Sequence, residues 1–256
     1  MQKHEIVIQK LILDIFNNKL RPATKLPPER TLATDLGIDR TSLRIALKQL
    51  ESMKILEIRQ GDGIYVKDYQ RHAGIDFLRM LIEPKEDNGD DILFDDYLIE
   101  EIWNFWIEFM PLMLSMAMDR ITPMEIKQFI HIFDEELENL DDGEKIVQLE
   151  AESQELVAEK TGNLIILLIA NSTRKMRLKL IRLFISNMNR EEIKRHVEAK
   201  RNVMRGRLSG DFIDTAMLAQ QYKEQLIYYR NLTRNGFKTS PPGPDSELKR
   251  SVQTSK

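Results

Sequence analysis

LPPERTLATDLGIDRTSLRIALKQLESMKILEIRQGDGIYV, residues 26–66, is the stretch that decides the fold of the N-terminal part of the chain. Its first helix is predicted over 28–36, because a proline and an acid are favoured in the first turn of a helix. Gly37 ends that helix where a left-handed residue is needed. Asp39 can cap a second helix over 40–53, whose apolar residues recur at helical spacing. Two short helices joined by a tight turn are therefore expected.

The end of the same stretch predicts a β-hairpin. Residues 55–59 and 64–67 alternate between apolar and polar side chains as strands do, and a turn of sequence QGDG (60–63) separates them. The glycines supply the positive φ angles of such a turn and leave room for the backbone to approach a minor groove. Because the features follow one another in this order, the stretch predicts a winged helix-turn-helix rather than a generic helix pair with a hairpin.

Polar side chains gather at the start of the second helix, opposite its apolar side. An arginine there can bind guanine edges or clamp a phosphate, and hydroxyl groups near the positive end of a helix bind phosphates. These properties predict a recognition helix for duplex DNA, with Arg40, Thr41, Ser42 and Arg44 as candidate contacts.

Charge is distributed unevenly along the chain. Residues 1–67 hold 12 lysines and arginines against 8 acids, whereas the remainder holds 26 against 33, and the formal net charge is −3. A basic N-terminal part on an acidic body suits a protein that presents one face to a polyanion. An uneven surface that arose by chance remains the alternative.

Composition excludes several classes of function. The chain has no cysteine, so disulfides, thiolate catalysis and cysteine-bound zinc are excluded. The four histidines are scattered, and neither a Ser/His/Asp arrangement nor a phosphate-binding glycine loop is present, so an enzyme is not expected. The longest apolar run, 164–170, is far shorter than the roughly 18 residues of a membrane-spanning helix. The N-terminus does not resemble a signal peptide, and a cytoplasmic protein is expected.

The predicted fold is mainly α, with an N-terminal winged helix-turn-helix that has a small β-hairpin wing. An all-α bundle of about six or seven helices is expected to follow it. The expected organisation is a DNA-binding domain, a linker, an effector-binding domain and a disordered tail, over residues 1–67, 68–75, 76–234 and 235–256 respectively.

Two long helices are expected within the C-terminal bundle. A helix over 94–120 contains Pro111, which is predicted to kink it or split it in two. Residues 163–187 are predicted to form one helix whose first two turns are apolar on all sides and therefore buried.

Residues 1–67 resemble the DNA-binding domain of the GntR family of bacterial transcription factors. The resemblance is carried by LPPER, LATDLGIDRTSLRIALKQLE and IRQGDGIYV at the family's spacing. It implies operator contacts by Arg30, Arg40, Thr41, Ser42, Arg44 and Gly61. At the wing tip the chain has Asp62, where the family often has a basic residue; an acid would repel phosphate, so Gln60 is an alternative contact. Because one recognition helix reads only a few base pairs, a homodimer on a palindromic operator is expected.

The body of the chain resembles the FCD-type effector domain of the FadR subfamily, and most of all its regulators of fatty-acid metabolism. Many such domains bind a divalent metal through one aspartate and three histidines. The matching positions here are Glu150, Gln154, Lys200 and Tyr222. Since imidazoles are missing and a lysine repels a cation, no metal and no other cofactor is expected.

An effector that is a fatty acyl-CoA or a related lipid-like molecule is the interpretation favoured by this resemblance. Bulky apolar residues and the 12 methionines suit a cavity that adapts to acyl chains. The candidate pocket residues are Trp103, Trp106, Phe109, Met110, Met113 and Tyr222. An aromatic and methionine stripe at helical spacing is also typical of ordinary core. A small organic acid as effector, a body without any effector, and a winged helix used only for protein contact remain alternatives.

Overall fold

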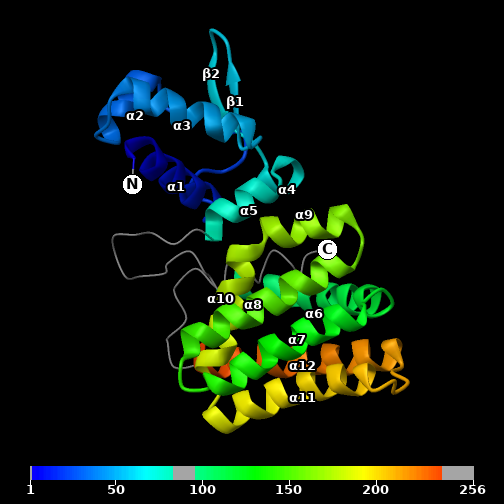
Figure 1. Cartoon of the computed structure of the whole chain (residues 1–256). Helices are drawn as coiled ribbons and strands as arrows, with labels where there is room; N and C mark the ends of the chain where they lie inside the picture. Colours follow the sequence, from blue (N-terminus) through cyan, green and yellow to red (C-terminus); the bar gives the residue numbers. More distant parts are fainter. Residues whose placement is uncertain (1, 83–95, 238–256) are drawn as a thin grey trace, which may run out of the picture. The chain divides into compact units, whose positions relative to one another are not determined.

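The computed structural model describes residues 2–82 and 96–237 (Figure 1). The chain divides into two units, Met1–Asp95 and Asp96–Lys256. Residues 84–91, PKEDNGDD, read from the sequence as a charged break, lie outside the described residues. Most of the tail expected over 235–256 lies outside them too, although 235–237 belong to the last helix.

The first unit contains the expected helix-turn-helix and wing. Asp39 caps the helix that begins at Arg40, as predicted, and Gly37 has a φ of +65° in the turn before it. The two strands pair antiparallel, with Leu56 opposite Val66. The first helix packs against the third, and the apolar side of the third is buried. These elements are α1 (Lys3–Phe16), α2 (Glu29–Asp35), α3 (Arg40–Ser52), β1 (Leu56–Arg59) and β2 (Gly63–Val66).

Two further helices, α4 (Tyr69–His72) and α5 (Ile75–Ile82), also belong to the first unit. The ring of Tyr69 lies 6.1 Å from that of Phe16 on α1 and 5.1 Å from that of Phe77 on α5. The apolar side of α5 thus covers α1. The sequence predicts a linker over 68–75 and an effector domain from residue 76 in this part of the chain, and these boundaries stay predictions.

The second unit is a helical bundle, as predicted. Within residues 96–237 it has seven helices, and α7 packs against α11, α6 against α12, and α8 against α10. The bundle therefore confirms the expected mainly α fold class. Its helices are α6 (Asp96–Met118), α7 (Pro123–Glu138), α8 (Gly143–Lys160), α9 (Leu164–Ser172), α10 (Arg174–Ser186), α11 (Arg190–Leu208) and α12 (Thr215–Phe237).

Helix α6 is continuous although Pro111 lies inside it. Proline removes one backbone hydrogen bond, but Met110 before it and Met113 two residues after it are buried in the core. Packing along the length of the helix offsets the lost bond, so the predicted split does not occur.

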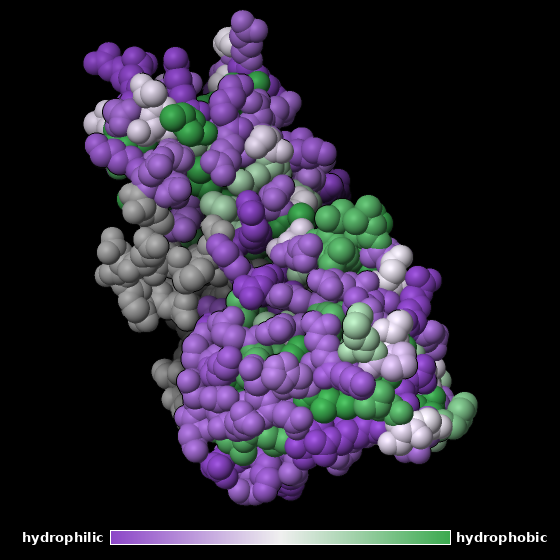
Figure 2. All heavy atoms as spheres, viewed as in Figure 1, coloured by the Kyte–Doolittle hydropathy of each residue, from purple (hydrophilic) through white to green (hydrophobic). Residues whose placement is uncertain are grey.

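The prediction of a single long helix over 163–187 is wrong. Helix α9 ends at Ser172 and α10 begins at Arg174, because the backbone leaves helical geometry at Thr173, with φ −102° and ψ 9°. The Thr173 hydroxyl donates to the Ile169 carbonyl at 2.7 Å. The predicted burial is also wrong, since Leu164, Ile165 and Leu168 are 66%, 64% and 51% exposed. Only one side of this short helix packs on its neighbours. The other side is apolar and exposed, and apolar patches are visible among the mainly hydrophilic atoms of Figure 2. No helix in the described part of the chain is long and apolar enough to cross a bilayer.

Candidate nucleic-acid interface and ligand cavity

The N-terminus of α3 is fixed by a cap that uses one of the predicted contact residues. Asp39 accepts hydrogen bonds from the Ser42 backbone N–H and from the Ser42 hydroxyl, each at 2.8 Å. These bonds hold the pKa of Asp39 below its usual value. Ser42 is half-buried, so its hydroxyl proton is engaged in positioning the helix.

The neighbouring side chains of α3 face solvent. Arg40, Thr41 and Arg44 are exposed, and residues four apart lie on one side of a helix. The Arg44 Nε donates to Glu29 at the start of α2 at 2.8 Å, which directs the guanidinium toward the first turn of α2. Arg30, the next residue on α2, is exposed as well. The two helix starts together present a cationic surface with a hydroxyl group.

Ile45 is a residue on this helix that the sequence reasoning missed. Its side chain is about half exposed, next to Arg44 and away from the buried stripe. Its position in the sequence could have identified it. Ile45 lies on the polar side of an amphipathic helix, where an apolar side chain is not part of the core.

The wing turns through glycines, as the sequence predicts. Gly61 has a φ of +77° and Gly63 a φ of +148°, a region that side chains disfavour. A Cβ on Gly63 would lie 2.6 Å from the Lys25 Cε, so this position also admits the lysine side chain. Gln60 and Gly61 are exposed at the tip.

Asp62, the acid at the wing tip, forms hydrogen bonds with two side chains of the same unit. The Asp62 carboxylate accepts from the Lys25 ammonium at 3.1 Å and from the Tyr65 hydroxyl at 3.0 Å. The lysine first and the tyrosine second lower the pKa of Asp62. The Arg59 guanidinium lies 4.4 Å from the centre of the Tyr65 ring. The negative charge of Asp62 is therefore offset by neighbouring cations.

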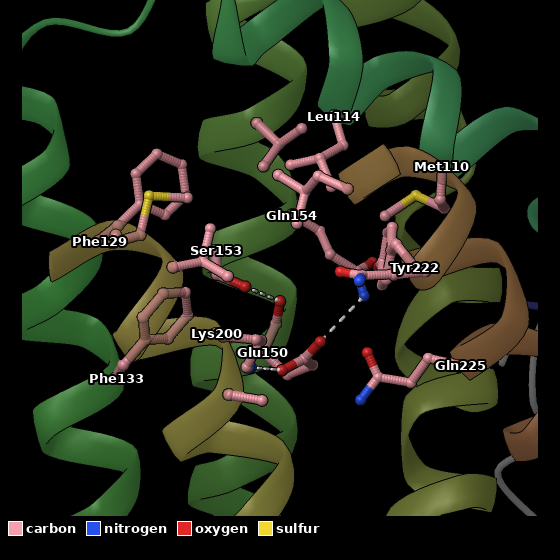
Figure 3. Close-up of a pocket in the computed structure, with 16 residues that line it drawn as sticks. Met110, Leu114, Phe129, Phe133, Glu150, Ser153, Gln154, Lys200, Tyr222 and Gln225 are labelled. Carbon is pink, nitrogen blue, oxygen red and sulfur yellow. Dashed lines mark hydrogen bonds and ion pairs between the residues drawn. The ribbon is translucent and has the colours of Figure 1, made fainter. Parts of the chain in front are cut away.

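The second unit contains a cavity of about 340 Å³ lined by residues of α6, α7, α8, α11 and α12. Figure 3 shows apolar side chains, among them Met110, Phe129 and Phe133, around a group of polar ones. The polar lining includes Glu150, Gln154, Lys200 and Tyr222, the four positions that the resemblance to the effector domain matched to metal ligands.

A buried ionic cluster adjoins this cavity, and two of its members, Glu150 and Lys200, line it. The Lys200 ammonium lies 3.0 Å from a carboxylate oxygen of Glu136 and also donates to Glu150. The side chains of Glu136 and Glu150 are 0% and 4% exposed, and that of Lys200 is 18% exposed. His196 Nε2 lies 3.3 Å from Glu150, and its Nδ1 contacts Gln225 at 3.1 Å.

The pKa values in the cluster follow from burial and from these pairs. Burial raises the pKa of Glu136 to about 7. Burial also acts to raise the pKa of Glu150, but the Lys200 ammonium outweighs it, so this pKa is lowered. Burial would lower the pKa of Lys200, yet the two carboxylates raise it, and the lysine stays charged. Burial and the nearby ammonium lower the pKa of His196, which is neutral at neutral pH.

These residues do not fit a divalent metal. Lys200 places its ammonium between the two carboxylates, where a metal would need to bind, and a cation is repelled there. Within residues 2–82 and 96–237, no three side chains of histidine, aspartate or glutamate are grouped so that they could hold a metal ion.

Residues 3–66 match the family described as "Bacterial regulatory proteins, gntR family". This segment is a gntR-family domain. The winged helix-turn-helix of α1 to β2 coincides with it.

Relatives of the gntR-family domain are named as regulators. The chain is 41% identical over 78 residues to the HTH-type transcriptional regulator Mce2R of Mycobacterium tuberculosis, which is 30% of this chain and 32% of the relative. It is 32% identical over 83 residues to the fatty acid metabolism regulator protein of Edwardsiella ictaluri, which is 32% of this chain and 35% of the relative. The chain thus spans about a third of the length of these curated relatives.

Among solved structures, Escherichia coli McbR/YncC is similar to the chain with a TM-score of 0.48 and 14% identity. The match covers 93% of this chain and all of that one.

Outside the gntR-family domain, the structure separates the six predicted pocket residues. Met110 and Tyr222 line the cavity. Trp103, Trp106 and Met113 are buried but are not among the lining residues. Phe109 is half-buried and stacks on Phe105, with ring centres 5.0 Å apart.

Proposed function

We propose that the chain is a sequence-specific DNA-binding transcription regulator that binds a palindromic operator as a homodimer. The observation that carries the proposal is the capped start of α3, which presents Arg40, Thr41 and Arg44 to solvent within a gntR-family domain. The N-terminal residues of such a helix contact base edges in the major groove. The proposal places the protein in the cytoplasm, with its operator.

Each exposed group has a role in this proposal. Arg30, Arg40 and Arg44 bind guanine edges or phosphates, and Thr41 binds a phosphate near the helix N-terminus. Ile45 is suited to contact a thymine methyl group. Ser42 acts through the helix cap. At the wing tip, Gln60 and Gly61 bring the backbone near the minor groove.

The body of the protein is proposed to bind an effector in the cavity, probed first with fatty acyl-CoA and related lipid-like molecules. Its mainly apolar lining with a few convergent polar groups is typical of a ligand site. One relative of the gntR-family domain is named a fatty acid metabolism regulator. An effector would change operator affinity by binding differently to two states of the homodimer.

The test is selection of duplex sequences by the full-length protein, followed by binding measurements over a range of salt concentrations. We expect a preferred palindrome and a steep fall of affinity with salt, because phosphate contacts release counterions. Arg44→Ala is expected to weaken binding to the selected sequence, whereas Lys223→Met on α12 serves as a control that leaves it unchanged. If the protein selects no sequence, the winged helix serves another purpose, such as protein contact.

A further inference from the structure

The polar wall of the cavity has no surplus of positive charge. Its ammonium, Lys200, is already shared by two buried carboxylates, Glu136 and Glu150. The ammonium also lies 4.7 Å from the centre of the Phe133 ring, which leaves little space around it. The remaining polar lining consists of amides and hydroxyls that carry no charge at neutral pH, among them Gln154, Tyr222 and Gln225.

A second buried cation of this unit, Arg177, is not part of the cavity lining. The Arg177 side chain is 1% exposed and donates to the Ala170 carbonyl at 3.1 Å, between α9 and α10. Arg177 is not among the lining residues, and Glu155 lies 3.5 Å from its guanidinium. An anion inside the cavity would therefore meet the Glu150 carboxylate, and the lining offers it no cation other than Lys200, which is already paired.

We infer that the cavity binds an amphiphile whose polar end is uncharged, such as an alcohol or an ester, and rejects the corresponding carboxylate. The inference rests on the proposal that this cavity is the effector site. An uncharged oxygen can accept from the Tyr222 hydroxyl or from the Gln154 amide, while the alkyl part contacts apolar residues such as Met110 and Phe129. A carboxylate would lose its hydration without gaining an ion pair, and burying an unpaired charge is strongly unfavourable.

The inference is tested with decanol and decanoate, two probes of equal chain length, added to the full-length protein below the solubility limit of decanol and the micelle concentration of decanoate. Calorimetric titration is expected to give a dissociation constant at least about tenfold lower for decanol, which corresponds to about 1.4 kcal/mol. Equal or tighter binding of decanoate would overturn the inference. Binding of neither probe would overturn it as well.

Glu136→Gln provides a variant whose expected effect is a gain. Glutamine has nearly the shape of glutamate, and the change leaves Lys200 with one carboxylate instead of two. The affinity for decanoate is expected to rise by at least about tenfold relative to that for decanol, a result that misfolding cannot produce. Glu108→Gln, a surface acid that pairs with Lys223 at 2.7 Å, is the matched control and should change neither affinity. If the Glu136→Gln variant keeps the same preference for decanol over decanoate, the charge of the cluster does not determine that preference.

Operator binding by the ligand-free protein is measured in parallel. Intact operator binding together with a preference for decanoate would reject the inference and leave the proposed DNA-binding function standing. The expected preference for decanol in a protein that selects no DNA sequence would reject the proposed function alone.

Discussion

Replacing Lys200 with methionine removes the cation that holds two buried carboxylates together. In the folded protein its ammonium contacts Glu136 and Glu150, both of which are almost fully buried. Methionine has a similar length and no charge, so the substitution changes the electrostatics of the cavity wall more than its packing.

The cost follows from the two acids that are left behind. Removing one partner of a buried ion pair typically costs about 3–5 kcal/mol, because an uncompensated charge remains. A change of 1 kcal/mol moves the melting temperature of a domain of this size class by about 2–4 °C. The second unit is therefore expected to melt about 6–20 °C lower, and protonation of the acids at lower pH should reduce the loss.

The measurement is thermal unfolding of the full-length protein at neutral pH and again near pH 5. Lys223→Met is the control, because Lys223 forms an ion pair of 2.7 Å with Glu108 at the surface, where such pairs contribute little. Combining Lys200→Met with Glu136→Gln and Glu150→Gln should restore most of the stability. If Lys200→Met costs no more than Lys223→Met, the ammonium does not hold the cluster and the charge account of the cavity is refuted.

Three further outcomes are expected. Asp62→Asn removes an acid from the wing and frees Lys25, so operator affinity should rise and the slope of log affinity against log salt should steepen by about one; weaker binding measured by titration would contradict this. Leu47→Ala, at a fully buried position of α3, should destabilise the first unit by about 2–5 kcal/mol while decanol binding persists, and calorimetry of both transitions checks it. The raised pKa of Glu136, about 7 when folded, contributes stability that is present below pH 4.5 and lost as the pH rises through 7; Glu136→Gln should flatten this pH dependence in denaturant titrations.

The helix-turn-helix could be predicted because its determinants are local. Gly37 and Asp39 fix a turn and a cap within three residues, and the glycines of the wing fix a hairpin in the same way. Burial could not be predicted so directly. Residues 164–168 are apolar on every side, yet whether a side of α9 is covered depends on elements distant in sequence.

The cavity illustrates the same difference. Its lining comes from residues between Met110 and Gln225 on five helices, and no local pattern brings them together. The sequence analysis identified Lys200 only as a position where a metal-binding histidine is missing. The structure adds Glu136, which carries no recognisable motif and lies 64 residues from the lysine that it contacts.

Trp103 and Trp106 are the two tryptophans of the chain, and both are buried on α6. Their fluorescence emission therefore reports on the second unit alone, whereas circular dichroism records the helices of both units. A protein with this distribution carries an intrinsic fluorophore confined to the bundle that contains the cavity. Comparing the two signals during one thermal scan resolves which unit unfolds first, without any attached dye.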